Sequence, residues 1–407
     1  MAKDPNGKEL PKGITWREDK QTYMARFTYQ GKSYTFYGKD LKKLTKKLAD
    51  KRYEAEHGLA GSADKITLDR WYQTWLEDYK IPNIKETSVN TYKQMYSCYI
   101  QKELGSRYLK QIKPVHIQKI YNTLLERGLA PKTVSIIQAV LYNIFEFAVK
   151  NDLIVKNPCN GITKPKKEKP KVEALSAGEQ NTLLHYLDKE KWKQYKPLIV
   201  TLLGTGMRIG ECLGLTWDDI DFKNMEIHIN KTLVYVKDLG TGKCMFKFQP
   251  PKTKESRRII PMLSDVAAAL KQQNKNQKRL MLYMGPEWQP LQDFQKMVFT
   301  SYKGTPYQES KIRKHLVNIV AEINADEKAL AEQEKRMPVM MKHIRPHMFR
   351  HTFATRCFEN DMPPKTVQHI LGHSSINLTM DLYTHMSEDK KKEDMKKLEG
   401  MFSAANY

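Results

Sequence analysis

Four short segments in the C-terminal half carry side chains that could act on a phosphodiester. They are TGMRIGE around Arg208, PHMFRH with His347 and Arg350, LGHSS with His373, and DLYTH with Tyr383. Together they supply two guanidinium groups, two imidazoles and one phenol. A phenol can attack phosphorus, while guanidinium groups and imidazoles can hold the negative charge that develops on its oxygens. The set predicts a site that cleaves and rejoins a phosphodiester without a metal.

The arginines suit this task because a guanidinium stays protonated and donates two parallel hydrogen bonds to a phosphate. Arg208 follows the turn-forming Gly204-Thr205-Gly206 and precedes Ile209-Gly210-Glu211. This context predicts that Arg208 stands at the start of a helix, where backbone N–H groups also favour anions. We expect Glu211 to orient Arg208 or another group of the site and to transfer no proton itself.

A histidine series offers a competing interpretation as a metal site. His343, His347 and His351 recur every four residues, as metal ligands on one helix face would. However, Pro346 interrupts the series, and no carboxylate or cysteine is grouped with it. We therefore expect neither a metal nor another cofactor.

Composition points to a polyanionic partner. The 407-residue chain has a formal net charge of +23, with 40% hydrophobic and 28% charged residues, which indicates a soluble globular protein of two or three domains. A basic excess of this size attracts nucleic acid and releases its counterions. A membrane surface is the alternative, but the charge is spread along the chain and no run approaches the length of a bilayer span. Five cysteines without a CxxC pair suggest reduced thiols in the cytosol.

The first 60 residues alternate as strands and then become helical. The segments ITW, TYMARFTY and SYTFYG are separated by turn signals at Glu18-Asp19 and Gln30-Gly31, and a helix is expected from about Lys39. This unit has 14 Lys and Arg against 8 Asp and Glu. A solvated basic domain would explain that excess, but aromatic and basic residues share the strands. We predict a DNA-binding domain over residues 1–60, a three-stranded sheet plus one helix.

Residues 65–163 are helical in pattern and are expected to form a DNA-binding bundle. Trp71, Trp75 and Leu76 mark one apolar face, and Pro114 and Pro131 stand where helices should begin. Most aromatic residues here should be core rather than base-stacking groups. The following KPKKEKPKV, residues 164–172, has the composition of an extended basic linker, which could be a spacer, a segment that lies on DNA, or both.

Residues 173–407 should form a mostly helical catalytic domain with a sheet insert. Residues 225–237 and 244–261 alternate as strands around a Gly240-Thr241-Gly242 turn, whereas residues 324–338 are an exposed helix or loop without assigned chemistry. The tail from Ser387 to Tyr407 has apolar residues at near-helical spacing. It either folds back on its own domain or, as we favour, packs on a neighbouring protomer.

In the order of these motifs the chain resembles the tyrosine recombinase (phage integrase) family. That family has an arginine in an R-x-x-E context, a lysine on a β-hairpin, an H-x-x-R pair, a second histidine in LGH-S, and a tyrosine. The matching residues are Arg208, Lys252 in PPKTKESRR, His347, Arg350, His373 and Tyr383. The resemblance spans about residues 65–390, including Asn157-Pro158, and the N-terminal sheet looks like the arm-binding domain of conjugative-transposon integrases.

The resemblance implies a role for each matching residue. Tyr383 would attack the phosphate, form a 3′-phosphotyrosyl bond and expel a 5′-hydroxyl, to which Lys252 would give a proton. Lys254, two residues away on the same strand face, is the alternative donor. His347 would assist proton handling at the tyrosine or bind a nonbridging oxygen, and His373 would donate a hydrogen bond to the phosphate.

One spacing departs from the family pattern. Tyr383 follows His373 by ten positions, where the family has nine. We expect the extra residue to be absorbed in a loop before the nucleophile. It would then shift the tyrosine slightly without removing it from the site.

The expected fold is multidomain and mainly α with α+β parts: the sheet-plus-helix unit, the helical bundle and the catalytic domain. The expected function is site-specific DNA recombination of a mobile element through a Holliday junction, in the bacterial cytoplasm. Its partners would be double-stranded DNA at core and arm sites, three further copies of the chain with the tail packed in trans, and accessory DNA-bending or excision factors, but no membrane. Two alternative functions are open. The chain could be a type IB-like topoisomerase, which would relax DNA as a monomer, or a noncatalytic DNA-binding regulator of the same fold, which would never form a phosphotyrosine.

Overall fold

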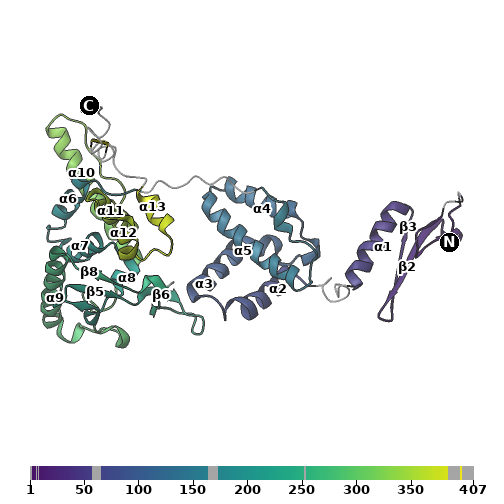
Figure 1. The fold of residues 1–407 in the computed structure, drawn as a ribbon, viewed down its shortest axis with the longest axis horizontal. Coiled ribbons are helices and arrows are strands. Elements are labelled where there is room, and N and C mark those ends of the chain that lie inside the picture. The colour runs from purple at the N-terminus through teal and green to yellow at the C-terminus, as the bar shows by residue number, and fades with distance from the viewer. Residues whose placement is uncertain are drawn as a thin grey trace, which may run out of the picture. The chain divides into compact units, whose positions relative to one another are not determined.

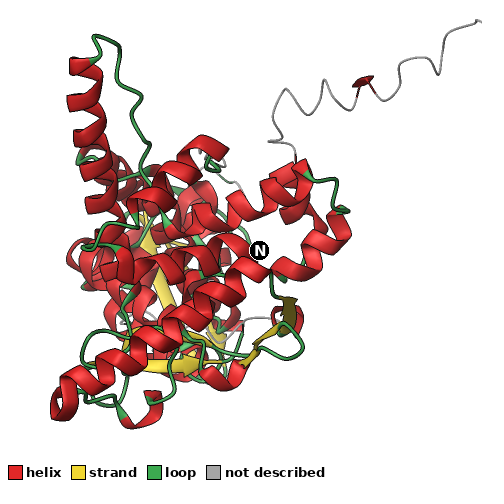
Figure 2. Ribbon diagram, turned by 90° about the vertical axis from the view of Figure 1, so that its left-hand side faces the viewer, coloured by secondary structure: helices red, strands yellow, loops and turns green. Residues whose placement is uncertain are grey.

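The structure, a computed structural model, forms two compact units, residues 1–169 and 170–407, which are described separately (Figure 1). The residues that it describes are 2–5, 7, 9–56, 66–163, 173–251, 254–383 and 395–396. The predicted basic linker 164–172 lies outside these residues, as does the tail from Ser387 apart from two positions. Helices dominate and strands are confined to small sheets (Figure 2), which confirms the predicted fold class.

The N-terminal sheet is antiparallel, and its strands follow in chain order: β1 (Ile14–Arg17), β2 (Thr22–Tyr29) and β3 (Lys32–Gly38). Gln30 and Gly31 form the predicted turn between β2 and β3, both with positive φ, as a two-residue hairpin loop requires. Helix α1 (Leu41–Glu56) packs Leu44 and Leu48, one turn apart, against the apolar face of the sheet.

The helical bundle has its core around α5. Its α-helices are α2 (Leu68–Thr74), α3 (Glu86–Met95), α4 (Pro114–Glu126) and α5 (Pro131–Lys150). α2 and α3 run on as π-helical segments to Lys80 and Gly105. Pro114 and Pro131 occupy first helical turns as predicted, where a missing N–H costs nothing. Trp71, Trp75 and Tyr96 are buried, which confirms them as core residues.

α5 corrects the expectation that no apolar run approaches the length of a bilayer span. Among the described residues it is the one helix long and apolar enough to cross a membrane by length and composition. Its apolar positions Val134, Ile137, Leu141 and Ile144 are buried, and the helix packs against α3 and α4. Core packing within the bundle therefore accounts for its composition.

The second unit surrounds small sheets with helices. Its helices are α6 (Ala177–Tyr186), α7 (Lys196–Thr205), α8 (Ile209–Leu213), α9 (Ser264–Met284), α10 (Glu309–Gln333), α11 (Pro346–Glu359), α12 (Pro364–Leu371) and α13 (Ile376–Tyr383). A capping box begins α6, because Ser176 Oγ accepts from Glu179 N at 3.1 Å and Glu179 Oε2 accepts from Ser176 N at 2.7 Å. Leu202, Ile227 and Leu316 belong to the larger of the hydrophobic clusters described in this unit.

The strands described in this unit form two sheets, whereas the sequence suggested one insert around a turn. The hairpin pairs β6 (Thr232–Lys237) with β7 (Cys244–Gln249), and the other sheet has the order β4 (Ile220–Asp221), β5 (Glu226–Ile229) and β8 (Arg258–Pro261). The residues between β7 and β8 include a 3-10 helix at Lys254–Ser256. The prediction that Lys254 lies on a strand is therefore wrong, and Lys252 lies outside the described residues.

Candidate active site

Arg208 stands on a tight turn between α7 and α8. Gly206 ends α7 with φ of +61°, and a Cβ there would lie 2.4 Å from Phe353 Cδ1 and 2.7 Å from Leu371 Cδ2. Glycine meets both the left-handed backbone and the close packing. Arg208 is the N-cap of α8, which confirms the predicted helix start. Its side chain keeps 40% of its surface exposed, so the guanidinium is open to an incoming anion.

Glu211 is the buried carboxylate that joins two arginines. Its Oε1 accepts from Arg208 Nη1 at 2.7 Å, its Oε2 accepts from Arg258 Nη2 at 2.9 Å, and Arg208 N donates to Oε2 at 2.9 Å. Burial by itself would raise the pKa of the Glu211 carboxyl, but Arg258 and then Arg208 lower it below its ordinary value. Glu211 is therefore ionised at neutral pH and contacts Arg208 as expected.

Arg258 on β8 is a member of the site that sequence reasoning missed. Its side chain is 6% exposed, and besides Glu211 it donates through Nε to Ile370 O at 2.5 Å and through Nη1 to Ser256 O at 3.1 Å. A signal was present in RRIIP, because Arg258 shares a strand face with the buried Ile260. A cation at an inward-facing strand position needs a buried partner.

Arg350 belongs to α11 and is 1% exposed. It donates through Nη1 to Gly206 O at 3.0 Å and through Nη2 to Leu371 O at 2.7 Å. Burial, followed by the nearby Arg208 guanidinium, lowers the pKa of Arg350 to about 9. A guanidinium has five N–H donors, so three remain after these two bonds. The lowered pKa indicates a cation that would gain from a nearby negative charge.

His347 lies in the first turn of α11, one turn before His351, and their rings meet edge to face with centroids 4.7 Å apart. Desolvation, then Arg350 and Arg208, lower the pKa of His347, although the side chain keeps an exposed face. His343 precedes the helix, so the series does not share one helix face. In the part of the chain that the structure describes, no three His, Cys, Asp or Glu residues are grouped to hold a metal ion.

His373 follows the left-handed Gly372 that ends α12. Its Nδ1 lies 2.9 Å from Thr379 Oγ1 on α13, and its carbonyl accepts from Gln368 Nε2 at 3.0 Å. Burial, then Arg350 and Arg208, lower the pKa of His373 to about 3. The imidazole is therefore neutral near pH 7 and carries one N–H, whose position the Thr379 contact governs.

Tyr383 is the last residue of α13, but its side chain lies outside what the structure describes. Residues 376–382 are helical, so the loop before the nucleophile is the short connection that precedes Ile376, and the absorption of the extra residue there stays a prediction. The spacing between His373 and Tyr383 consists of a short connection followed by two turns of helix. Thr379 lies one turn before Tyr383 on that helix.

The described part of the site has a surplus of positive charge. Three guanidinium groups, those of Arg208, Arg258 and Arg350, influence one another, and Glu211 supplies the negative charge among them. Only Arg208 of the three keeps a large exposed surface. The arrangement can hold an anion whose charge increases during a reaction, as at a phosphate under attack.

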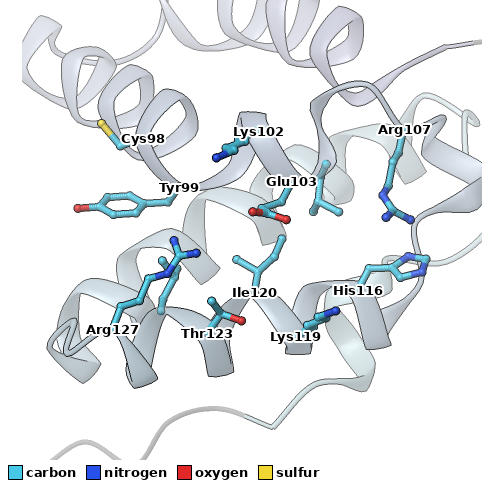
Figure 3. A pocket seen from close by; sticks show the side chains of 12 residues that line it. Cys98, Tyr99, Lys102, Glu103, Arg107, His116, Lys119, Ile120, Thr123 and Arg127 are labelled. Carbon is cyan, nitrogen blue, oxygen red and sulfur yellow. The ribbon is translucent and has the colours of Figure 1, made fainter.

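The helical bundle carries a second basic feature, a cavity of about 340 Å³ between the π-helical segment Tyr96–Gly105 and α4 (Figure 3), which we call the basic groove. Five basic side chains line it: Lys102, Arg107, His116, Lys119 and Arg127. Glu103 is the acidic residue among the lining side chains. Lys102 and Lys119 approach the cavity from its two sides, so the groove can hold a phosphate backbone.

Comparisons with known proteins cover both units. The sequence profile of the phage integrase family matches residues 173–390, and that of the phage integrase N-terminal SAM-like domain matches residues 67–125. A XerC-like tyrosine recombinase of Caldanaerobacter subterraneus subsp. tengcongensis is 31% identical over 378 residues, which cover 90% of this chain and 91% of that protein. The transposase of transposon Tn916 from Enterococcus faecalis is 27% identical, over 88% of this chain and 84% of its own length.

Solved structures of integrases are also similar to this chain. The integrase of transposon Tn1549 in complex with a circular intermediate DNA superposes with a TM-score of 0.67 at 26% identity, covering 82% of this chain and 99% of that one. The lambda integrase tetramer bound to a Holliday junction has a TM-score of 0.55 at 16% identity, covering 92% and 95%. At that identity the second match shows a shared fold.

Proposed function

Because the chain belongs to the phage integrase family and is a site-specific tyrosine recombinase, we propose that Tyr383 is its nucleophile. The phenolic oxygen attacks the scissile phosphate in line, a 3′-phosphotyrosyl bond forms, and the 5′-oxygen leaves as a hydroxyl. The ester keeps the bond energy, so a 5′-hydroxyl of another strand can reverse the step without ATP. The reaction needs neither a metal ion nor another cofactor.

The other site residues act on charge and protons. Arg208 and Arg350 bind the nonbridging oxygens, with Glu211 orienting Arg208. His373 donates a hydrogen bond to the phosphate, and His347 binds an oxygen or takes the tyrosine proton. Lys252 protonates the leaving 5′-oxygen, with Lys254 as the alternative donor. The observation that carries the proposal is the cluster of three arginines around one buried carboxylate, which leaves positive charge for a phosphate.

The proposed substrate is double-stranded DNA of a mobile element. Residues 1–60 bind arm sites, residues 65–163 bind core sites, and residues 173–407 carry out catalysis, joined by the basic segment 164–172. Four copies exchange strands through a Holliday junction, with each tail packed on a neighbour and with accessory DNA-bending or excision factors. The setting is the bacterial cytoplasm. The solved Tn1549 and lambda complexes, which hold circular intermediate DNA and a Holliday junction, support this proposal.

A suicide substrate tests the proposed function. A nick close to the cleavage site lets the short 5′-hydroxyl fragment diffuse away after attack, which traps the covalent complex. Sites are found first by sequencing genomic fragments that the protein captures covalently. We expect an SDS-resistant complex in the presence of EDTA and the absence of ATP. If DNA is bound specifically but no such complex forms, the chain is a noncatalytic regulator; relaxation of any supercoiled plasmid by a monomer would favour a topoisomerase.

The basic groove gives a prediction for DNA affinity. Lys102→Ala and Lys119→Ala should each weaken core-site binding and lower the slope of log affinity against log salt by about 0.9, the value for one lost phosphate contact. Glu103→Gln is the matched control, because removing a negative charge from the same groove should strengthen binding. Fluorescence anisotropy across a salt series measures both. Unchanged slopes in the lysine variants would exclude the groove from the DNA interface.

A further inference from the structure

Thr379 differs from other buried helical threonines in what its hydroxyl contacts. Thr201, Thr205 and Thr352 donate to the backbone carbonyl four residues earlier, a common arrangement in helices. The Thr379 hydroxyl instead lies 2.9 Å from Nδ1 of His373, and the Thr379 side chain is 0% exposed. The hydroxyl is thus committed to the imidazole within the protein interior.

The backbone around His373 is fixed from several sides. Arg258 binds the carbonyl of Ile370, Arg350 binds that of Leu371, and Gln368 binds that of His373 itself. Both arginines lie at the C-terminal end of α12, where the helix dipole favours positive charge. The position of the imidazole is therefore set by its backbone, and the Thr379 contact sets its remaining freedom, the ring orientation and the tautomer.

We propose that Thr379 is a positioning residue, whose hydroxyl donates to Nδ1 of His373 and so directs an Nε2–H toward the scissile phosphate. The inference rests on the proposed role of His373 as a hydrogen-bond donor. A phosphate oxygen can only accept a hydrogen bond, so a neutral imidazole serves it only if the proton is on the nitrogen that faces it. The opposite tautomer would present a lone pair to a negatively charged oxygen.

A hydroxyl is suited to this task because it can donate to an unprotonated ring nitrogen. The neutral state of His373 follows from its buried, cation-rich surroundings, so one proton must be assigned to one of two nitrogens. The same hydroxyl links the phosphate site to the nucleophile, because Thr379 and Tyr383 lie one turn apart on α13. The contact therefore also connects His373 to the helix that carries Tyr383.

The test is a double-mutant cycle in single-turnover cleavage of the suicide substrate. Thr379→Val replaces the hydroxyl by a methyl group and should slow cleavage about 10- to 100-fold, the range found when the hydrogen-bond partner that orients a metal-bound histidine is removed. Thr379→Ser keeps the hydroxyl and should restore most of the rate. In a His373→Ala background, Thr379→Val should cause almost no further loss of cleavage rate, because a residue that acts only through His373 has no effect once that imidazole is gone.

Thr201→Val is the matched control. Thr201 is also 0% exposed in a helix, and its hydroxyl bonds Pro197 O at 2.7 Å. It should lose some stability but cleave within about threefold of the native rate, as expected for a buried hydrogen bond outside the site. Equal losses of rate in Thr201→Val and Thr379→Val, or a Thr379→Val effect that persists without His373, would show a purely structural role and overturn the inference.

A second measurement does not depend on a folded valine variant. The 15N chemical shifts of His373 in the native chain distinguish the two neutral tautomers, and we expect the proton on Nε2. A proton on Nδ1 would overturn the inference. If the native chain forms no covalent complex at all, the proposed function is wrong as well. If the native chain forms the complex and Thr379→Val cleaves at the native rate, only the role of Thr379 is wrong.

Discussion

Replacing Tyr383 with phenylalanine is expected to abolish covalent complex formation completely while leaving DNA binding within about twofold. The substitution removes one oxygen, the atom that we propose forms the bond to phosphorus, and a phenyl ring cannot form that bond. The remaining aromatic ring keeps the apolar character of the position at the end of α13. SDS gels of the suicide-substrate reaction and anisotropy of intact duplex measure the two quantities separately.

Tyr302→Phe is the control for this experiment. Tyr302 belongs to the same unit and its side chain is 60% exposed, so loss of its hydroxyl should change neither cleavage nor binding. A covalent complex that survives Tyr383→Phe would show that another side chain attacks the phosphate. Loss of DNA binding together with cleavage would instead show that the substitution disturbs the fold.

Local signals allowed several helix starts to be predicted, including the one at Arg208. The start of α8 at Arg208 follows from glycines before it and a glutamate three residues after it, so neighbours in sequence determine the turn. The capping box at Ser176 and the prolines at the starts of α4 and α5 are equally local. Each of these features depends on contacts within one helical turn, which a sequence displays directly.

Long-range contacts were not visible in the same way. Arg258 meets Glu211 from 47 positions away and Ile370 from 112 positions away. The hairpin β6–β7 joins strands that are close in sequence, and it was expected. β5 and β8 lie on either side of that hairpin in the sequence, so their pairing depends on the tertiary structure. Thr379 carried no signal beyond its position between His373 and Tyr383, because its role depends on a side-chain orientation that the tertiary packing decides.

These long-range contacts explain how the site is held together. Arg258 and Arg350 come from β8 and α11, yet they bind the consecutive carbonyls of Ile370 and Leu371. Arg258 also binds Glu211, which binds Arg208. The turn that presents His373 and the turn that presents Arg208 are therefore connected through one carboxylate, so a change at Glu211 should affect both.

Glu211→Gln is accordingly expected to lower the cleavage rate at least a hundredfold. The substitution releases Arg208, and it leaves the guanidinium groups of Arg208 and Arg258 close together without the carboxylate that neutralises them. It should also reduce the free energy of unfolding by about 3–5 kcal/mol, the usual cost of breaking a buried ion pair. The folded-state pKa of Glu211 is lowered, so its stabilisation is present above the unfolded pKa and is lost as pH falls through the folded value. The stability difference between native protein and variant should thus be largest near neutrality and shrink below about pH 4.

Glu179→Gln is the matched control, because Glu179 also closes a capping box and has a cationic partner, Lys342, at 3.1 Å. Its side chain is 24% exposed, so the substitution should cost about 1 kcal/mol or less and leave cleavage unchanged. Urea unfolding at several pH values and single-turnover cleavage give the comparison. If Glu211→Gln matches Glu179→Gln in both measurements, the shared carboxylate does not hold the arginines in working positions. If stability falls but cleavage does not, Arg208 keeps its place through the phosphate itself.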